Sequence, residues 1–166
     1  MKKSLFILFV LLFSQNLFSQ LDAGDDYIFS GYSNDNELHV YFNKNIRKNE
    51  QIKNTYFVWS KWFEFGDSKN KSIELLTEGK RFHSEIKNEE QLFYYIQLII
   101  VDIYTYKYKN LSKIYYDNFN NIIYSYDYKE SENEWSYAVP NSMIDVLIGD
   151  VKSYLYSKNK KLKSKK

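Results

Sequence analysis

The chain has 166 residues, a formal net charge of +2, two histidines and no cysteine, and 19% of its residues are aromatic. The length fits one domain with short appendages. The missing cysteines exclude disulfides, thiolate metal sites, a cysteine nucleophile and the lipidated cysteine of a lipoprotein. A disordered chain would be poor in aromatic residues, so we expect most of this one to fold.

Residues 1–19 have the layout of a secretory signal peptide. Lys2 and Lys3 precede an apolar run at residues 5–13, and a polar segment of small residues follows, with cleavage expected after Ser19. The apolar run is shorter than the roughly 17–25 residues of a membrane-spanning helix. We therefore predict an exported protein, periplasmic, secreted or at the cell surface of a Gram-negative bacterium. It would have no lipid anchor and no transmembrane segment in the mature chain.

The charges of the mature chain are divided between a body and a tail. Lys2 and Lys3 leave with the signal peptide, so 21 basic residues remain against 21 acidic ones. Six of those lysines belong to residues 157–166, and the body at 20–156 is acidic. Nucleic-acid binding, which needs a basic folded surface, is disfavoured. The tail is either a solvated end or a weak contact for anionic surfaces.

Aromatic and β-branched runs predict most of the sheet. The predicted strands comprise residues 27–29, 37–42, 55–65, 91–108, 112–117 and 122–128. Alternation in the second strand would place His39 on its polar face. The run from 91 lacks alternation, which favours a central strand covered on both faces, and its end at 104–109 alternates as a strand with one wet face. Asn-rich residues 118–121 predict a hairpin turn, and residues 66–90 are interpreted as mainly surface loop with a possible short helix or strand at 72–76.

The last element is predicted to be a helix. Ser142 and Asp145 have the spacing of a capping box. Five apolar residues then follow one face of a helix, namely Ile144, Leu147, Ile148, Val151 and Leu155. We therefore predict an α+β fold, an antiparallel β-sheet of about five to six strands packed by one C-terminal α-helix.

The sequence indicates a contact surface and no catalytic chemistry. Tyrosines with interleaved lysines offer stacking area with a polar tip, and they form the candidate binding surface Tyr104, Tyr106, Lys107, Tyr108 and Lys109. The alternative is that these rings pack under the helix or across strands. His39 and His83 are interpreted as structural or surface residues. We predict no catalytic, cofactor-binding or metal-binding residue and no enzymatic activity.

Four segments resemble the bacterial surface-adhesin E family. They are a turn at residues 41–48, the Val-Trp-Ser-Lys strand at 58–61, a stretch from Asp102 that ends in Tyr-Tyr-Asp at 115–117, and a closing Trp-x-x-x-Val-Pro-x-Ser at 135–142. The matching residues are Trp59, Lys61, Asp102, Tyr116, Asp117, Trp135, Pro140 and Ser142.

The resemblance implies an antiparallel sheet with a C-terminal helix, adhesion to extracellular proteins and no enzymatic activity. It also implies a cysteine pair, whose positions here hold Ile103 and an apolar helix residue, Val151 in the favoured register. We therefore expect an exported, non-enzymatic binding domain that contacts an unidentified protein or glycan of the envelope or the extracellular space. The alternative is a small periplasmic inhibitor or carbohydrate-binding module, with a periplasmic enzyme less favoured.

Overall fold

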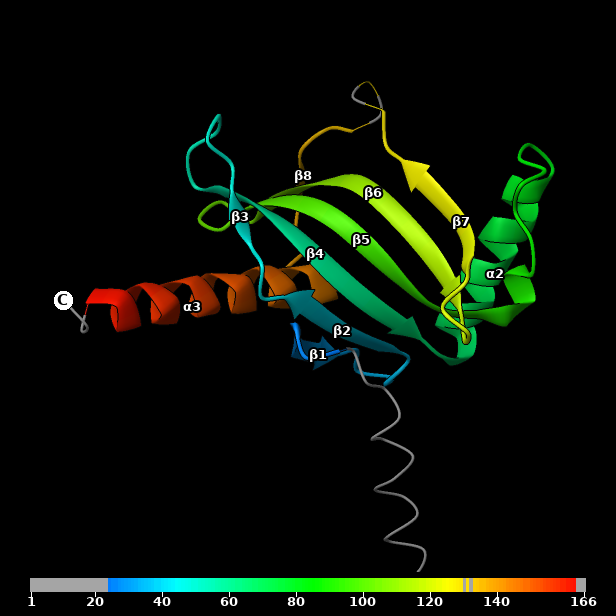
Figure 1. Ribbon diagram of the computed structural model, residues 1–166, viewed down its shortest axis with the longest axis horizontal. Helices are drawn as coiled ribbons and strands as arrows, with labels where there is room; N and C mark the ends of the chain where they lie inside the picture. The colour runs from blue at the N-terminus through cyan, green and yellow to red at the C-terminus, as the bar shows by residue number, and fades with distance from the viewer. Residues whose placement is uncertain (1–23, 130, 132, 164–166) are drawn as a thin grey trace, which may run out of the picture.

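The computed structural model describes residues 24–129, 131 and 133–163, so the predicted signal peptide lies outside the described residues. A single antiparallel sheet runs in the order β1-β2-β4-β5-β6-β7, with β3 paired to β4 and β8 paired to β6. This confirms the predicted α+β class (Figure 1). The elements are β1 (Tyr27–Tyr32), β2 (Leu38–Asn43), β3 (Arg47–Lys48), β4 (Thr55–Glu64), α2 (Gly66–Lys80), the 3-10 turn η1 (Glu89–Gln91), β5 (Leu92–Asp102), β6 (Lys107–Asp117), β7 (Ile122–Asp127), β8 (Ser136–Tyr137) and α3 (Met143–Lys163).

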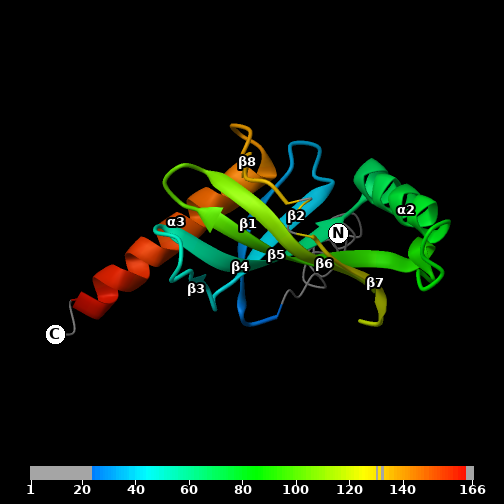
Figure 2. The same cartoon turned by 90° about the horizontal axis from the view of Figure 1, so that it is seen from above.

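Helices α2 and α3 lie on the same side of this sheet (Figures 1 and 2). Leu147, Ile148 and Val151 of α3 are fully buried in a cluster with residues of β2, β4 and β5. Leu76 of α2 is buried in a second cluster, and Tyr115 of β6 packs against both. Two hydrophobic cores therefore share one face of the sheet, one under each helix.

The start of α3 follows the predicted cap. The Asp145 backbone N–H donates to Ser142 Oγ at 3.3 Å, and Asp145 Oδ2 accepts from the backbone N–H of Asn141 at 2.9 Å. Each contact satisfies a backbone donor that the helix start leaves free. The helix continues to Lys163, through the first part of the lysine-rich tail.

A second helix replaces the loop expected at residues 66–90. Helix α2 has little apolar periodicity, since Ile73, Leu75 and Leu76 are its only large apolar residues. Its N-terminus is capped from a distant element, because the Glu37 carboxylate accepts the backbone N–H groups of Asp67 and Ser68 at 3.1 and 2.9 Å. The possible short helix at 72–76 is thus part of a longer helix, and the loop expected around it begins only after Lys80. The length of α2 was missed because its cap and the packing of Leu76 are tertiary contacts, which local periodicity does not show.

The strand expected at 104–109 begins only at Lys107. Strand β5 ends at Asp102, whose Oδ1 accepts the N–H groups of Tyr104 and Thr105 at 2.9 and 3.1 Å. Tyr106 then adopts a left-handed conformation with φ of 55°. The chain therefore turns without glycine or proline, and the carboxylate of Asp102 supplies the turn chemistry instead.

His39 lies on the face of β2 opposite Val40 and Phe42, as the alternation predicted, but that face is aromatic and not polar. His39 is 8% exposed, and its ring lies 5.2 Å from the Phe65 ring and 6.4 Å from the Phe29 ring, measured between centroids. The error arises because both faces of β2 carry large side chains.

The hairpin of β6 and β7 forms as predicted, with Asp117 Oδ1 accepting the N–H groups of Phe119 and Asn121 at 2.8 Å.

No helix of the described part of the chain is sufficiently long and apolar for a membrane crossing.

The turn after β5 is held against α3. The hydroxyl groups of Tyr104 and Tyr156 hydrogen-bond at 3.0 Å, and the Lys152 ammonium lies 5.4 Å from the ring centroids of both Tyr104 and Tyr106. Ile103 and Val151 are 3% and 0% exposed in the same core cluster. These two positions, which the family resemblance singles out, are therefore candidates for a cross-link.

The double variant Ile103→Cys/Val151→Cys should form a disulfide on air oxidation. The cross-link would raise the free energy of unfolding by about 2–4 kcal/mol, because it closes a long loop in the unfolded chain. Thiol titration and urea unfolding with and without reductant measure both effects. The control Ile103→Cys/Val146→Cys uses an exposed position of the same helix and should stay reduced. A double variant with two free thiols after oxidation would show Cα atoms more than about 7 Å apart and contradict the prediction.

Candidate functional site

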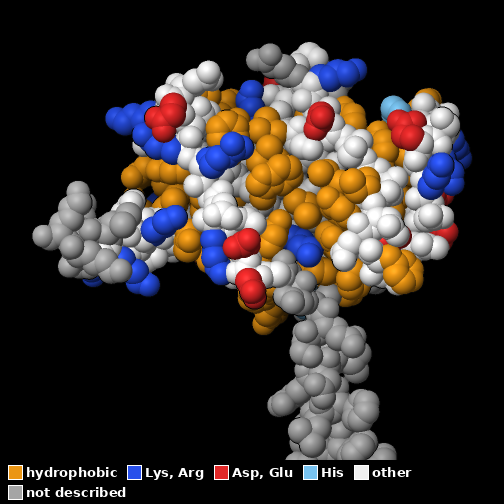
Figure 3. All heavy atoms as spheres, viewed as in Figure 1, with side chains coloured by type: hydrophobic (Ala, Val, Ile, Leu, Met, Phe, Trp, Pro, Cys, Tyr) orange, Lys and Arg blue, Asp and Glu red, His pale blue; other side chains and the backbone are white. Residues whose placement is uncertain are grey.

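The side of the sheet that no helix of the described residues covers carries an aromatic surface. The register of the strand pairs places one set of side chains on this side, and Figure 3 shows hydrophobic side chains gathered over β4, β5 and β6 there. Strand β5 was expected to be covered on both faces, but within residues 24–129 and 133–163 a helix covers only one of them. We call this set the open face; its rings are Tyr27, Phe29, Tyr32, Tyr41, Phe57, Trp59, Phe63, Tyr94 and Tyr116.

Cationic groups lie among the rings of the open face. The Lys61 ammonium is 4.2 Å from the Tyr94 ring centroid, and the Arg47 guanidinium is 5.8 Å from the Phe57 centroid. Such contacts stabilise a cation while leaving it close to the surface. Burial raises the pKa of Tyr94 to about 12, so this ring stays neutral at physiological pH. The open face therefore combines apolar area with positive charge.

Several rings of the open face are accessible to a partner. Phe29 is 48% exposed and Tyr32 is 62% exposed, both on the edge strand β1. Phe29 makes an edge contact with Tyr41, whose centroid is 5.2 Å away. The accessible rings are thus fixed by neighbouring rings, which lowers the entropy lost when they bind.

The tyrosine and lysine row predicted from the sequence is split between two surroundings. Tyr104 is exposed in the turn, whereas Tyr106 and Tyr108 pack against the main core. Lys107 lies 4.5 Å from the Tyr137 ring and Lys109 lies 5.6 Å from the Trp135 ring, measured to the centroids. The five residues therefore do not present one flat row of rings.

Two aspartates of the family pattern act as turn caps. Asp102 and Asp117 both accept backbone N–H groups of the turns that follow them. Burial acts to raise the pKa of Asp102, and the backbone hydrogen bonds outweigh it so that the pKa is lowered. The bond from the Asn121 side chain is the main cause that lowers the pKa of Asp117. Trp59 and Lys61 lie on the open face, Ser142 caps α3, and Tyr116 stacks on Tyr94 at 4.9 Å.

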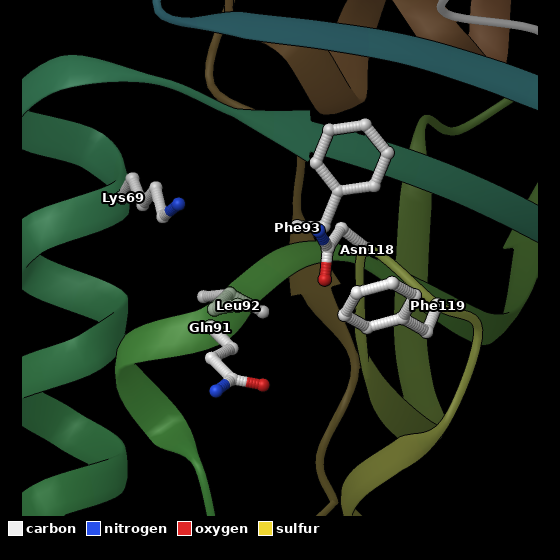
Figure 4. Close-up of a pocket in the computed structure, with 6 residues that line it drawn as sticks. All are labelled: Lys69, Gln91, Leu92, Phe93, Asn118 and Phe119. Atoms are coloured by element: carbon white, nitrogen blue, oxygen red, sulfur yellow. The ribbon is translucent and has the colours of Figure 1, made fainter.

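Two surface hollows adjoin the ends of the strands. One of about 340 Å³ is lined by Lys109, Trp135 and residues of the loop after β3. Another of about 460 Å³ lies between α2, the start of β5 and the turn after β6, with Lys69, Phe93 and Phe119 on its sides (Figure 4). Both hollows are open to solvent, and Lys69 and Lys109 are half-buried in them.

A third pocket, of about 240 Å³, lies between α2 and the hairpin of β6 and β7. Lys113 of β6 reaches into it, and Tyr126 of β7 stands opposite Lys113 in the strand pairing. The Lys113 ammonium is 3.6 Å from the Tyr95 centroid and 4.7 Å from the Tyr115 centroid. Sequence reasoning missed Lys113, although its two-residue spacing from Tyr115 already placed it on the same face as that ring.

Burial makes the charged form of Lys113 unfavourable. Burial lowers the pKa of Lys113 to about 8, although the nearby Glu64 carboxylate acts against this shift. Glu64 is 8% exposed, and its Oε2 has no hydrogen-bond partner among the described residues. Burial also raises the pKa of Glu64, while a hydrogen bond from Ser72 of α2 partly offsets that effect. No salt bridge of 4.0 Å or less joins the two residues in the described part of the chain.

The histidines occupy separate surroundings. The His39 ring hydrogen-bonds the Asn36 amide at 2.9 Å, and burial lowers its pKa. His83 Nδ1 lies 3.5 Å from Glu85 Oε1, with both side chains largely exposed, and its ring centroid is 5.7 Å from that of Tyr124. Among the described residues, no group of three His, Cys, Asp or Glu side chains could hold a metal ion.

No protein-family model matches the chain, and no curated protein matches its sequence. Two solved structures of protein E from Haemophilus influenzae are similar in fold. One, the selenomethionine form, is 10% identical, with a TM-score of 0.49 over 80% of this chain and 89% of that one. The other, from a non-typeable strain, is 11% identical, with a TM-score of 0.48 over 80% and 79%.

Replacing Lys113 by methionine should stabilise the protein at pH 7. Removing a partly buried charge would raise the free energy of unfolding by about 1–2 kcal/mol. The folded pKa of about 8 lies below that of an unfolded lysine, so wild-type stability rises with pH between the two values. The advantage of the variant should therefore shrink by about 1–2 kcal/mol between pH 7.5 and pH 9.5.

Urea unfolding of both proteins at the two pH values measures this difference. The control Lys87→Met changes an exposed lysine and should give the same small difference at both pH values. A Lys113→Met variant that is less stable than wild type at pH 7 would contradict the burial argument.

Proposed function

We propose that this protein is an exported, non-enzymatic binding domain that docks on a protein partner through the open face. The observation that carries the proposal is the absence of a covering helix over an aromatic side of the sheet in the described residues. Large apolar patches at the surface of a soluble domain are typical of interaction sites. The domain would act by adhesion, and the proposal contains no catalytic step.

The chemistry of the open face favours a protein with acidic side chains. Tyr, Trp and Phe are enriched in the buried centres of protein interfaces, and Trp59 lies near the middle of the face on β4. Arg47, Lys61 and Lys109 supply positive charge. Two carboxylates on the same side, Asp102 and Asp127, lie at strand ends, and Asp102 accepts backbone N–H groups of the turn that follows it. An apolar patch flanked by Asp and Glu would complement this arrangement.

Single substitutions on the open face should weaken partner binding. We expect Trp59→Ser and, separately, Phe29→Ser to weaken retention of a partner at least tenfold, because each removes a ring from the contact. Immobilised mature protein is incubated with envelope extract of the producing cell and with purified extracellular matrix proteins, and each retained protein is then titrated. Retention should fall in high salt, since exposed charge pairs are screened.

The matched control is Phe82→Ser, because Phe82 is 84% exposed in the loop after α2, away from the open face. It should bind as wild type does. Thermal melting shows whether each variant is folded, and Phe29, being half exposed, tests the face independently of the more enclosed Trp59. If every protein retained by wild type is retained equally by both open-face variants, the proposal is overturned.

Export is supported by the arrangement of residues 1–19 in the sequence. Fractionation of the producing cell, followed with an antibody to the mature chain, should place the protein in the periplasm, at the surface or in the medium. The mature N-terminus should begin at Gln20. A protein found in the cytoplasm with residues 1–19 still attached would contradict this part of the proposal.

A further inference from the structure

The pocket between α2 and the β6–β7 hairpin contains a largely buried lysine ammonium that makes no salt bridge among the described residues. It lies on the side of the sheet that carries the helices, opposite the open face. Its lining is tyrosine-rich, with apolar residues of α2 and the following loop, and Lys113 is its only lysine. The lining tyrosines are Tyr115, Tyr124, Tyr126 and Tyr128.

The neighbours of Lys113 hold its charge without using its hydrogen-bond donors. The Tyr95 and Tyr115 rings face the ammonium at 3.6 and 4.7 Å from their centroids. Ring faces attract a cation electrostatically, but the three N–H groups of an ammonium need oxygen acceptors for full satisfaction. Glu64 acts on Lys113 through its field at more than 4.0 Å. A carboxylate entering the pocket could accept the hydrogen bonds that these neighbours leave unused.

The walls suit a single polar ring. Tyr126 and Tyr128 form an edge contact with centroids 5.0 Å apart, and Tyr124 lies against His83 at the rim. Aromatic faces pack on the C–H faces of a small ring, and phenol hydroxyls reach hydrogen-bonding groups at its edge. About 240 Å³ lies just below the volume of sites for drug-sized ligands, so the pocket admits one ring.

Two carboxylates near this pocket, Glu64 and Glu85, would repel an anionic ligand. Glu64 lies beneath the pocket with its Oε2 buried, and Glu85 is at the rim beside His83. Burial raises the pKa of Glu64, which weakens its repulsion of an anion in mildly acidic solution. Glu85 is mostly exposed and lies 3.5 Å from His83, so solvent and the imidazole reduce its effect on a ligand.

We propose that this pocket binds an acidic monosaccharide unit, with its carboxylate on the Lys113 ammonium and its ring against Tyr126 and Tyr128. The unit could be a free uronic acid or the end of an acidic glycan, since both present the same carboxylate and ring. This site is independent of the proposed docking through the open face, because the two surfaces lie on opposite sides of the sheet.

NMR titration of the 15N-labelled mature protein at pH 6.5 tests the site. Sodium D-glucuronate should cause saturable shifts confined to the end of α2, residues 81–86 and the β6–β7 hairpin. D-glucose, which lacks the carboxylate, and acetate, which lacks the ring, should each bind at least tenfold more weakly. A hyaluronan tetrasaccharide that binds more tightly than glucuronate would identify a glycan end as the source, and weaker binding would identify the free sugar acid.

Variants separate this site from general anion binding. Lys113→Met and Tyr126→Ala should each reduce glucuronate affinity at least tenfold, while Lys87→Met leaves it unchanged. Because Lys113→Met is expected to be folded and more stable, its loss of binding would not reflect unfolding.

Absence of saturable shifts with glucuronate, or binding that both pocket variants retain, would overturn the proposal. Equal affinity for glucose would overturn the role of the carboxylate. Trp59→Ser should bind glucuronate normally even if it loses the protein partner.

Discussion

The pairing of β4 with β5 is the constraint on which both surfaces of this protein depend. Residues 55–63 pair with 94–102 in one uninterrupted antiparallel register. A shift by one residue would send every side chain of a strand to the opposite face. In the observed register, Trp62 stacks on Tyr95 at 5.7 Å on the helix side, and its Nε1 donates to Ser60 Oγ at 2.9 Å. The same register puts Lys61, Phe63 and Tyr94 together on the open face.

The two faces of the β4–β5 pair are both aromatic, but different groups cover them. The helix side is filled at its ends by α3 and α2, and between them remain Lys113 and the enclosed Glu64. The open face relies on its own rings for packing, as in the cluster of Phe63 and Tyr94. Chain connectivity accounts for part of this, because α2 follows directly on β4 and α3 returns from β8 to the same side. The described chain thus buries one apolar face and leaves the other available to a partner.

Local signals predicted the elements whose stabilising contacts lie close in sequence. The α3 stripe and its cap, and the hairpin around Asp117, are of this kind, because their determinants are at most a few turns apart. Helix α2 could not be predicted in this way, since Leu76 packs with Ile86, Leu92 and Ile123, and Glu37 caps the helix from thirty residues away. The turn at 103–106 lacks glycine and proline, and only Asp102 marked it. The missing alternation in the run from residue 91 indicated that both faces of β5 are apolar. Whether a helix covers each face depends on the topology of the chain, which this pattern does not show.

Lys61 of β4 and Lys113 of β6 show how the central strand β5 serves two kinds of site. Tyr94 and Tyr95 are consecutive, so their rings point to opposite faces, and each carries a lysine ammonium, at 4.2 Å for Lys61 and 3.6 Å for Lys113. On the open face the cation remains near solvent among rings, which suits recognition of a large acidic surface. On the helix side α2 closes over the strand pair, and the ammonium loses water without gaining a carboxylate within 4.0 Å among the described residues. A charge kept in such a place opposes stability, and a ligand that supplies the missing acceptor would remove that penalty. The arrangement that makes Lys113 unfavourable for folding is therefore the one that would make the pocket selective for a carboxylate.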